Sequence, residues 1–225
     1  MLKILLTGIT GQLGSELENI LSKEWKIFPV SRKEMDLSDE ATIRRTIRDK
    51  KPDLIINPAA YTSVDTAEVE KEMAFVINEK APRIIAEEAK TLNIPLIHFS
   101  TDFVFDGKKH TPYLETDAPS PINVYGLSKL EGEKAIQEVD GDYLIFRTAW
   151  VYSHQGNNFR NTIRRLAKER PELNFINDHV RSPTTTYISL VVKKIIELLF
   201  RKKRDHFPVV QGDLSPNLWW DLFLV

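Results

Sequence analysis

Short apolar runs of strand length alternate with segments of helical periodicity along most of the chain. This alternation is typical of right-handed βαβ units that build a parallel sheet. Strands that are apolar at consecutive positions are usually covered on both faces. We therefore expect an α/β fold with a doubly wound parallel sheet. The expected strands are Lys3–Leu6, Lys26–Val30, Leu54–Asn57, Pro95–Ser100, Tyr143–Arg147 and, with a weaker pattern, Asn174–Ile176.

Helices are expected between and after these strands, wherever apolar residues recur at helical spacing. The pattern predicts them near Gln12–Ser22, Glu40–Asp49, Ala67–Thr91 (with a break at Pro82 left open), Ser128–Glu138, Phe159–Glu169 and Tyr187–Phe200. The last of these has one apolar face, so we expect it to pack on the main sheet. That face consists of Ile188, Val191, Val192, Ile195, Ile196 and Leu199.

The length of 225 residues allows one well-buried domain with a smaller lobe. The character of the chain changes after the last strong strand. We expect a main domain over residues 1–153 and a partial lobe over residues 154–225, with some elements returning to the main sheet.

Charge and cysteine content exclude several classes of function. Lys and Arg number 31 against 32 for Asp and Glu, so a nucleic acid or an anionic membrane is not expected as a partner. The basic run Arg201–Arg204 is interpreted as a solvated helix end, with a nucleic-acid patch as the alternative. The chain has no cysteine, which excludes disulfides and a thiol nucleophile. The apolar run in Met1–Leu6 is too short for a signal peptide and no run reaches the roughly 18 residues of a membrane span. We therefore expect a cytoplasmic protein.

A glycine-rich turn follows the first expected strand. Gly8, Gly11 and Gly14 lie three residues apart, and the helical pattern begins directly behind them. Glycines allow a tight turn and a close approach of the backbone to a pyrophosphate, which the free N–H groups of the helix then bind. In this strand-turn-helix context we favour dinucleotide binding, and hence a Rossmann-type sheet, over a plain turn.

The end of the second strand indicates which dinucleotide is bound. An acidic residue there would bond the 2′-hydroxyl of NAD, whereas an arginine accommodates the 2′-phosphate of NADP. The chain has Ser31 and Arg32 at that point, with no acid, so we expect NADPH and leave NADH open. Arg32 as an exposed surface charge is the alternative. Asp36-Leu37 is placed to flank the adenine, although Asp36 could cap the next helix. The small residues of Asn57–Ala60 suit the passage of the cofactor, and a structural turn explains them nearly as well.

Tyr125 and Lys129 are four residues apart, which places them on one helix face. A free tyrosine has a pKa near 10, and lowering it to about 7 requires roughly 4 kcal/mol of phenolate stabilisation. The Lys129 ammonium would supply part of this, so that Tyr125 gives its proton to a carbonyl oxygen as hydride arrives. The alternative is a surface helix start with Tyr125 as a partly buried anchor.

A second group of polar residues, Ser100-Thr101-Asp102, ends the fourth long strand, at the edge where open α/β sheets bind ligands. The Thr101 hydroxyl can bond a substrate carbonyl, and Asp102 can orient neighbours or accept substrate hydroxyls. The alternative is that both side chains only cap a turn.

The sequence does not favour a hydrolase or a metal site. No Gly-x-Ser-x-Gly elbow occurs. The histidines show no metal-ligand spacing, so no metal is expected. They are His98, His110, His154, His179 and His206.

Taken in order, these motifs carry a resemblance to the extended short-chain dehydrogenase/reductase superfamily and, within it, to the dTDP-4-dehydrorhamnose reductase family. The matching stretches are TGITGQLG (7–14), NPAAYTSVDTAE (57–68), STDFVFDG (100–107), YGLSKLEGE (125–133), RTAWVY (147–152) and GNNF (156–159).

The resemblance implies an NADPH-dependent reduction of the C4 keto group of dTDP-4-dehydro-6-deoxy-L-mannose to dTDP-L-rhamnose. Thr101, Tyr125 and Lys129 would be catalytic, with Tyr125 as the acid and Lys129 also holding the nicotinamide ribose. The implied cofactor-binding residues are Gly8, Thr10, Gly11, Gln12, Leu13, Gly14, Ser31, Arg32, Asp36, Leu37, Asn57, Ala59, Ala60, Tyr61, Asn78, Tyr125 and Lys129. The implied substrate-binding residues are Thr62, Val64, Asp65, Thr101, Asp102, Phe103, Trp150 and Asn158.

Two relatives of this kind offer different interpretations. Sugar-nucleotide dehydratases carry an acid where this chain has Phe103, which disfavours elimination of water. The regulatory beta subunit of methionine adenosyltransferase shares the same body, and a non-catalytic NADP-binding subunit is therefore the main alternative. A homodimer is one option for either. Trp150 would offer the deoxysugar an apolar face or, alternatively, fill the seam between lobes.

The end of the chain departs from the family pattern. His206–Leu224 looks like a late strand and the start of the next helix, yet members usually continue for several more elements beyond the equivalent of Val225. We expect this apolar end to dock on the domain, to pair with another subunit or to mark a truncated gene.

Overall fold

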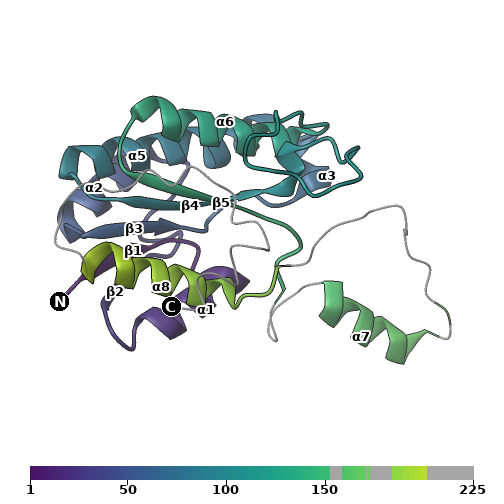
Figure 1. Cartoon of the computed structure of the whole chain (residues 1–225), viewed down its shortest axis with the longest axis horizontal. Coiled ribbons are helices and arrows are strands. Elements are labelled where there is room, and N and C mark those ends of the chain that lie inside the picture. The colour runs from purple at the N-terminus through teal and green to yellow at the C-terminus, as the bar shows by residue number, and fades with distance from the viewer. Residues whose placement is uncertain (153–158, 171, 173–183, 202–225) are drawn as a thin grey trace.

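The structure is a computed structural model, and it describes residues 1–152, 159–170, 172 and 184–201. Within these residues a five-stranded parallel sheet in the order β2-β1-β3-β4-β5 is covered by helices on both faces (Figure 1). The doubly wound α/β fold is thus confirmed. The strands are β1 (Lys3–Leu6), β2 (Lys26–Pro29), β3 (Leu54–Asn57), β4 (Leu96–Thr101) and β5 (Tyr143–Thr148).

Side chains alternate between the two faces of the sheet. Ile4 and Leu6 of β1 pack on the side of α1 and α8, whereas Leu5 packs on the side of α2 and α5. Figure 1 shows these helices as layers below and above the sheet, with α6 beside α5. The helices are α1 (Gln12–Leu21), α2 (Glu40–Lys50), α3 (Val64–Ala67), α4 (Lys71–Phe75), α5 (Ala81–Leu92), α6 (Val124–Val139), α7 (Phe159–Glu169) and α8 (Ile188–Arg201).

The strand predictions agree closely with the structure. The bounds of β1 and β3 are confirmed residue for residue. β2 ends one residue earlier than expected, and β4 extends through Thr101, which becomes the last residue of a buried strand. The weak expectation of a strand at 174–176 lies outside the described residues.

The helix around Pro82 is not broken there. Proline has no N–H to donate to the carbonyl four residues earlier, and a π-helical turn, η1 (Val76–Lys80), precedes it and joins α4 to α5. The carbonyl of Asn78 then lies so close to α6 that a Cβ on Gly132 would be 1.9 Å from its oxygen. Gly132 therefore permits the tight contact between η1 and α6.

α6 begins at Val124, four residues before the predicted start. The Asn123 side chain caps it, because its Oδ1 accepts a hydrogen bond from the N–H of Gly126 at 2.7 Å. Tyr125 and Lys129 therefore both lie on this helix, in its first two turns.

α8 returns to the main sheet, as its apolar face predicts. Ile188, Val192 and Ile196 join the same core as Leu17 of α1 and Ile4 of β1. α7 lies to one side of this body in Figure 1. No helix in the described part of the chain is both long and apolar enough to cross a bilayer. Residues 202–204 of the basic run and the apolar end of the chain lie outside that part.

Candidate active site

The glycine turn joins β1 to α1 at the carboxyl edge of the sheet. Gly8 has a φ of 60°, and a Cβ there would lie 2.9 Å from the nitrogen of Ala59. A Cβ on Gly14 would lie 2.1 Å from the oxygen of Gly8. These two positions tolerate only glycine because backbone atoms meet there.

Gly11 differs from the other two glycines. It is the N-cap of α1, no side chain caps that helix end, and an added Cβ would meet only the Gly8 oxygen, at 3.3 Å. A side chain here would stand in front of the helix N-terminus, with one tight contact to the Gly8 oxygen. The bare backbone at Gly11 thus fits the close approach of a dinucleotide phosphate.

The loop after β3 lies against this turn. The N–H of Ala59 donates to Thr7 Oγ1 at 3.3 Å. Asn78 accepts from the N–H of Tyr61 at 2.8 Å and donates to the Tyr61 carbonyl and to Ser128 Oγ, both at 3.0 Å. Asn78 is fully buried and ties this loop to α6. If Asn78 contributes to cofactor binding, as predicted, it does so by holding the backbone of Tyr61 in place.

The end of β2 requires a correction. An acid does reach this point, because Glu34 turns back and accepts hydrogen bonds from the N–H and the hydroxyl of Ser31, at 2.9 and 3.0 Å. The Ser31 N–H and hydroxyl, in that order, lower the pKa of Glu34 from its ordinary value. The prediction overlooked it because Glu34 is three residues beyond Ser31 in sequence. Arg32 is largely exposed, and its Nε lies 3.4 Å from Asp36 Oδ2.

The alternative for Asp36 is wrong, because Asp39 and not Asp36 caps α2. Asp39 Oδ1 accepts from the N–H groups of Ala41 and Thr42, at 2.9 and 3.3 Å. Asp36 instead bonds the N–H and hydroxyl of Ser38, at 2.9 and 2.7 Å. Asp36 and Leu37 are half-buried beside the end of β2.

Thr101 and Tyr125 meet at the end of β4. The Thr101 hydroxyl lies close enough to the Tyr125 phenol to lower its pKa, and Thr101 Oγ1 donates to Asp102 Oδ1 at 3.2 Å. The Phe103 ring stands edge-on to the Tyr125 ring, with centroids 5.5 Å apart and an interplanar angle of 78°. Thr101 Oγ1 also accepts from the N–H of Phe103 at 3.2 Å, at the start of the 3₁₀ turn η2 (Asp102–Val104). Thr101 therefore caps a turn, as the alternative for this residue held, and also lies beside Tyr125.

The charge environment differs from the predicted one. Burial raises the pKa of Tyr125, as does the charge of Asp102, while the hydrogen bond with Thr101 works in the opposite direction. Lys129 is not among these causes, because its Nζ donates to the Phe99 carbonyl at 2.7 Å and lies 3.2 Å from His98 Nε2. The expectation that Lys129 lowers the pKa of Tyr125 is thus not met in this structure. Burial lowers the pKa of Lys129 itself to about 8, opposed by Glu133.

The predicted substrate residues surround this edge of the sheet. Thr62 and Asp65 are exposed at the start of α3, Val64 is half-buried between them, and Asp102 and Phe103 are half-buried. Trp150 follows β5, is 41% exposed and has a left-handed φ of 44°. Such backbone strain in a large residue clusters at functional sites. Asn158 lies outside the described residues, as do His154, His179 and His206.

Sequence reasoning treated His98 only as one of several scattered histidines. In the structure it is fully buried and is the polar neighbour of Lys129. The available signal was a polar residue near the end of each of three apolar strands, at Thr7, Asn57 and His98. Within the described residues, no cluster of three or more potential metal ligands is found.

The sequence of this chain is similar to the sequences of known proteins. Residues 2–209 match the family model described as the RmlD substrate binding domain. The dTDP-4-dehydrorhamnose reductase of Escherichia coli K12 is 48% identical over 187 residues, covering 81% of this chain and 62% of that protein. The enzyme of the same name from Burkholderia thailandensis is 46% identical over 183 residues, covering 81% of this chain and 61% of that one.

A solved structure shows the same likeness in three dimensions. The dTDP-4-dehydrorhamnose reductase from Bacillus anthracis, crystallised in complex with NADP, is 38% identical and superposes with a TM-score of 0.84. The match covers 88% of this chain and 71% of that one. The chain thus spans only 61–62% of the length of the two relatives above.

Proposed function

The chain belongs to the family of the RmlD substrate binding domain, and we propose that it reduces the C4 keto group of dTDP-4-dehydro-6-deoxy-L-mannose to dTDP-L-rhamnose with NADPH. The names of the relatives support this reaction. The observation that carries it is the juxtaposition of Thr101 and Tyr125 at the carboxyl edge of β4, where the Tyr125 ring stands edge-on to Phe103, with Lys129 one helical turn further on.

The cofactor is proposed to lie across the glycine turn, with its pyrophosphate at Gly11 and the N-terminus of α1. The bare backbone at Gly11, the N-cap of α1, and the NADP held by the Bacillus anthracis relative support this placement. When bound, NADPH supplies hydride to the carbonyl carbon. The residues that would hold it are the predicted set around the turn, the end of β2 and the loop after β3: Gly8, Thr10, Gly11, Gln12, Leu13, Gly14, Ser31, Arg32, Asp36, Leu37, Asn57, Ala59, Ala60 and Tyr61. Asn78, also in the predicted set, would act through Tyr61.

Tyr125 is proposed to give its phenolic proton to the C4 oxygen as the alkoxide develops. The O–H bond of the phenol breaks and that of the product alcohol forms. The raised pKa of Tyr125 keeps it protonated at neutral pH, as an acid must be. Thr101 lowers the pKa of Tyr125 and so favours the phenolate that results, and Lys129 is proposed to bond the ribose hydroxyls of the cofactor.

The sugar is proposed to lie against Trp150, whose partly exposed ring suits the methyl group and ring C–H groups of a deoxysugar. The polar contacts would come from both sides of this edge. The proposed contact residues are Thr62, Val64, Asp65, Asp102, Phe103 and Asn158.

The division into a domain over residues 1–153 and a lobe over residues 154–225 stays a prediction, as do the cytoplasmic location and a homodimer. A non-catalytic regulatory subunit is not favoured, since the relatives from Escherichia coli and Burkholderia thailandensis carry the names of reductases.

The test is turnover by the purified chain. Mixed with NADPH and enzymatically made dTDP-4-keto-6-deoxyhexose, the chain should cause the absorbance of the reduced nicotinamide to fall, with one NADPH oxidised per sugar reduced. Binding of NADPH is followed separately by its fluorescence. A chain that binds NADPH but oxidises none with saturating keto-sugar would refute the proposed reduction and favour the binding subunit.

A further inference from the structure

A row of polar side chains crosses the sheet just inside its carboxyl edge. Thr7 follows β1, Asn57 ends β3 and His98 lies in β4, where it is the register partner of Asn57. Thr7 is 2% exposed and the other two are fully buried. Buried polar groups are costly unless they are hydrogen-bonded, so the pairing within this row decides whether it stabilises the fold.

The row is continuously hydrogen-bonded. Thr7 Oγ1 donates to Asn57 Oδ1 at 2.6 Å, and Asn57 Nδ2 donates to His98 Nδ1 at 3.2 Å. At one end Thr7 Oγ1 accepts from the N–H of Ala59, beside the glycine turn. At the other end His98 Nε2 lies 3.2 Å from Lys129 Nζ. A buried chain of hydrogen bonds therefore connects the cofactor edge of the sheet with Lys129.

The charge of Lys129 determines which atom donates and which accepts in each hydrogen bond of this row. With Asn57 Nδ2 donating to Nδ1, the proton of a neutral His98 is on Nε2, which faces Lys129 and pairs with its uncharged amine. An ammonium can only donate. Charging Lys129 therefore moves the His98 proton to Nδ1 and turns the Asn57 amide over. His98 stays uncharged throughout, because burial first and Lys129 second hold its pKa well below the usual value.

We propose that His98 is a positioning residue for Lys129, and that the row of Thr7, Asn57 and His98 couples the charge state of Lys129 to the cofactor edge of the sheet. As an ammonium, Lys129 donates to the Phe99 carbonyl and to His98 Nε2, so its third N–H is left for a ribose hydroxyl. The role of Lys129 in reduction rests on the proposed function, whereas the hydrogen-bonded row does not.

Few charged groups act on Lys129. Among the described residues, Glu133 is the one whose charge acts on its pKa, and it opposes the effect of burial. The Glu133 carboxylate is held by Arg147 of β5, with Arg147 NH2 2.7 Å from Oε2. Asp102, after β4, acts on Tyr125 instead. Among the described residues, charged groups that contact α6 from the elements packed on it also include Glu68, Arg83 and Lys90. Glu68 Oε1 accepts from the Val124 N–H at 2.8 Å, Arg83 pairs with Glu138 of α6, and Lys90 Nζ donates to the Val139 carbonyl at 2.7 Å.

A matched pair of variants tests the proposal. The amide of His98→Gln reaches the position of Nε2 and can still accept from Lys129, whereas that of His98→Asn reaches only the position of Nδ1. An ammonium loses more than an amine when a hydrogen-bond partner is removed. We therefore expect His98→Asn to move the alkaline limb of the pH profile of kcat/KM about one pH unit lower and to weaken NADPH binding. His98→Gln should stay near the parent, and His110→Gln, at an exposed histidine, is the control.

A purely structural His98 would give a different result. The pH profiles of kcat/KM for His98→Asn and His98→Gln would then fall at the same alkaline pH as that of the parent, even if the rates themselves were lower. This outcome would overturn the proposal. If the parent reduces no keto-sugar, the proposed function fails, but the row is still tested in the cofactor-free protein by imidazole ¹⁵N shifts. We expect His98 to gain no second proton between about pH 5 and 8, its two nitrogen shifts to exchange as Lys129 loses its charge near pH 8, and this exchange to be absent in Lys129→Met. Unchanged shifts would overturn the proposal.

Discussion

At the scale of single residues, the glycines of the turn have separable roles. Gly14 is required by the fold because its Cβ would lie 2.1 Å from a backbone oxygen, whereas a Cβ on Gly11 would meet one backbone oxygen at 3.3 Å, a contact that a small shift relieves. Their spacing in the sequence predicts the same role for all three glycines, in the turn that binds the pyrophosphate. The difference between them depends on the path of the backbone around Gly8, which spacing does not reveal.

We therefore expect opposite effects from two alanine substitutions. Gly11→Ala should fold with a loss of stability of about 1 kcal/mol or less but raise the Kd for NADPH at least tenfold, since a methyl group stands where the phosphate must approach. Gly14→Ala should lower Tm markedly because backbone atoms must move. Thermal unfolding and NADPH fluorescence titration measure both. Normal NADPH binding by a folded Gly11→Ala would contradict the placement of the pyrophosphate.

The cofactor preference is a second residue-scale prediction. Arg32→Ala should weaken NADPH more than NADH, because only the former carries a 2′-phosphate. Glu34→Gln should strengthen NADPH, since it removes a negative charge held beside Ser31. Lys33→Ala, at the exposed residue between them, is the control. Equal changes in the two dissociation constants would count against recognition of a 2′-phosphate at this point.

At the scale of elements, the sequence predicted strands better than helix ends. β1 and β3 are short apolar runs with polar neighbours, so pattern alone determines their bounds. The start of α6 was missed because Gly126 weakens the helical pattern just where the Asn123 side chain caps the helix. The π-turn before Pro82 was missed for a different reason. It depends on the contact of Asn78 with Gly132, which are 54 residues apart in the numbering of the chain.

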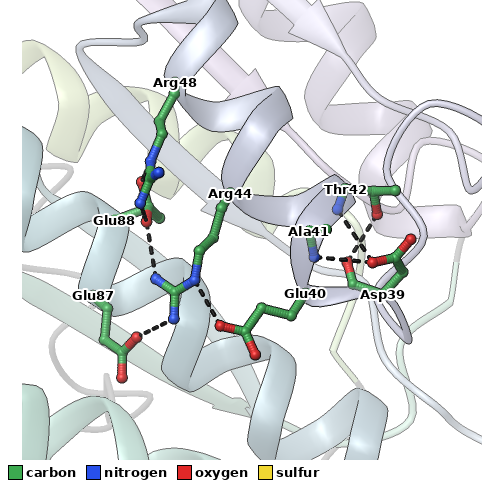
Figure 2. Close-up of polar contacts among 8 residues, drawn as sticks. All are labelled: Asp39, Glu40, Ala41, Thr42, Arg44, Arg48, Glu87 and Glu88. Carbon is green, nitrogen blue, oxygen red and sulfur yellow. Dashed lines mark hydrogen bonds and ion pairs between the residues drawn. The ribbon is translucent and has the colours of Figure 1, made fainter.

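An ion-pair cluster joins α2 to α5. Figure 2 shows Arg44 reaching Glu40, Glu87 and Glu88, and Arg48 reaching Glu88. The Arg44 contacts are 2.7, 2.6 and 2.9 Å long, and Arg48 donates to the two Glu88 oxygens at 2.7 and 2.6 Å. The Glu88 side chain is only 2% exposed. Its hydrogen bonds to Arg48, and then those to Arg44, lower its pKa from the ordinary 4.5.

We expect Glu88→Gln to lower the free energy of unfolding by about 2 kcal/mol at pH 7. A lowered carboxyl pKa contributes stability above the ordinary value of 4.5, and this contribution is lost as pH falls through the lower folded-state pKa. The difference between Glu88→Gln and the parent should therefore shrink as pH falls below 4.5. Urea unfolding at several pH values measures it. Glu87→Gln, at a more exposed partner of Arg44, is the control and should cost less; an equal cost would contradict the importance of burial.

At the scale of the whole molecule, the carboxyl edge of the sheet brings together the glycine turn, the Thr101–Tyr125 pair and the exit of β5. Gln12 Nε2 donates to the Val151 carbonyl at 3.4 Å, so the start of α1 touches the segment behind Trp150. The sequence predicted Thr101, Tyr125 and Lys129 as one site from their motifs. It did not predict that Lys129 faces His98, because that contact joins α6 to the interior of β4 and needs the packed structure.

The most direct test of the account is the rate of keto-sugar reduction by Tyr125→Phe, with NADPH at saturation. Removing the acid should lower kcat by at least about 10²-fold while the Kd for NADPH changes little, because the Phe103 contact needs only the ring. Tyr187→Phe, which removes an exposed phenol just before α8, should match the parent. If Tyr125→Phe oxidises NADPH with the keto-sugar as fast as the parent does, Tyr125 is not the acid and the proposed reaction at this edge of the sheet is wrong.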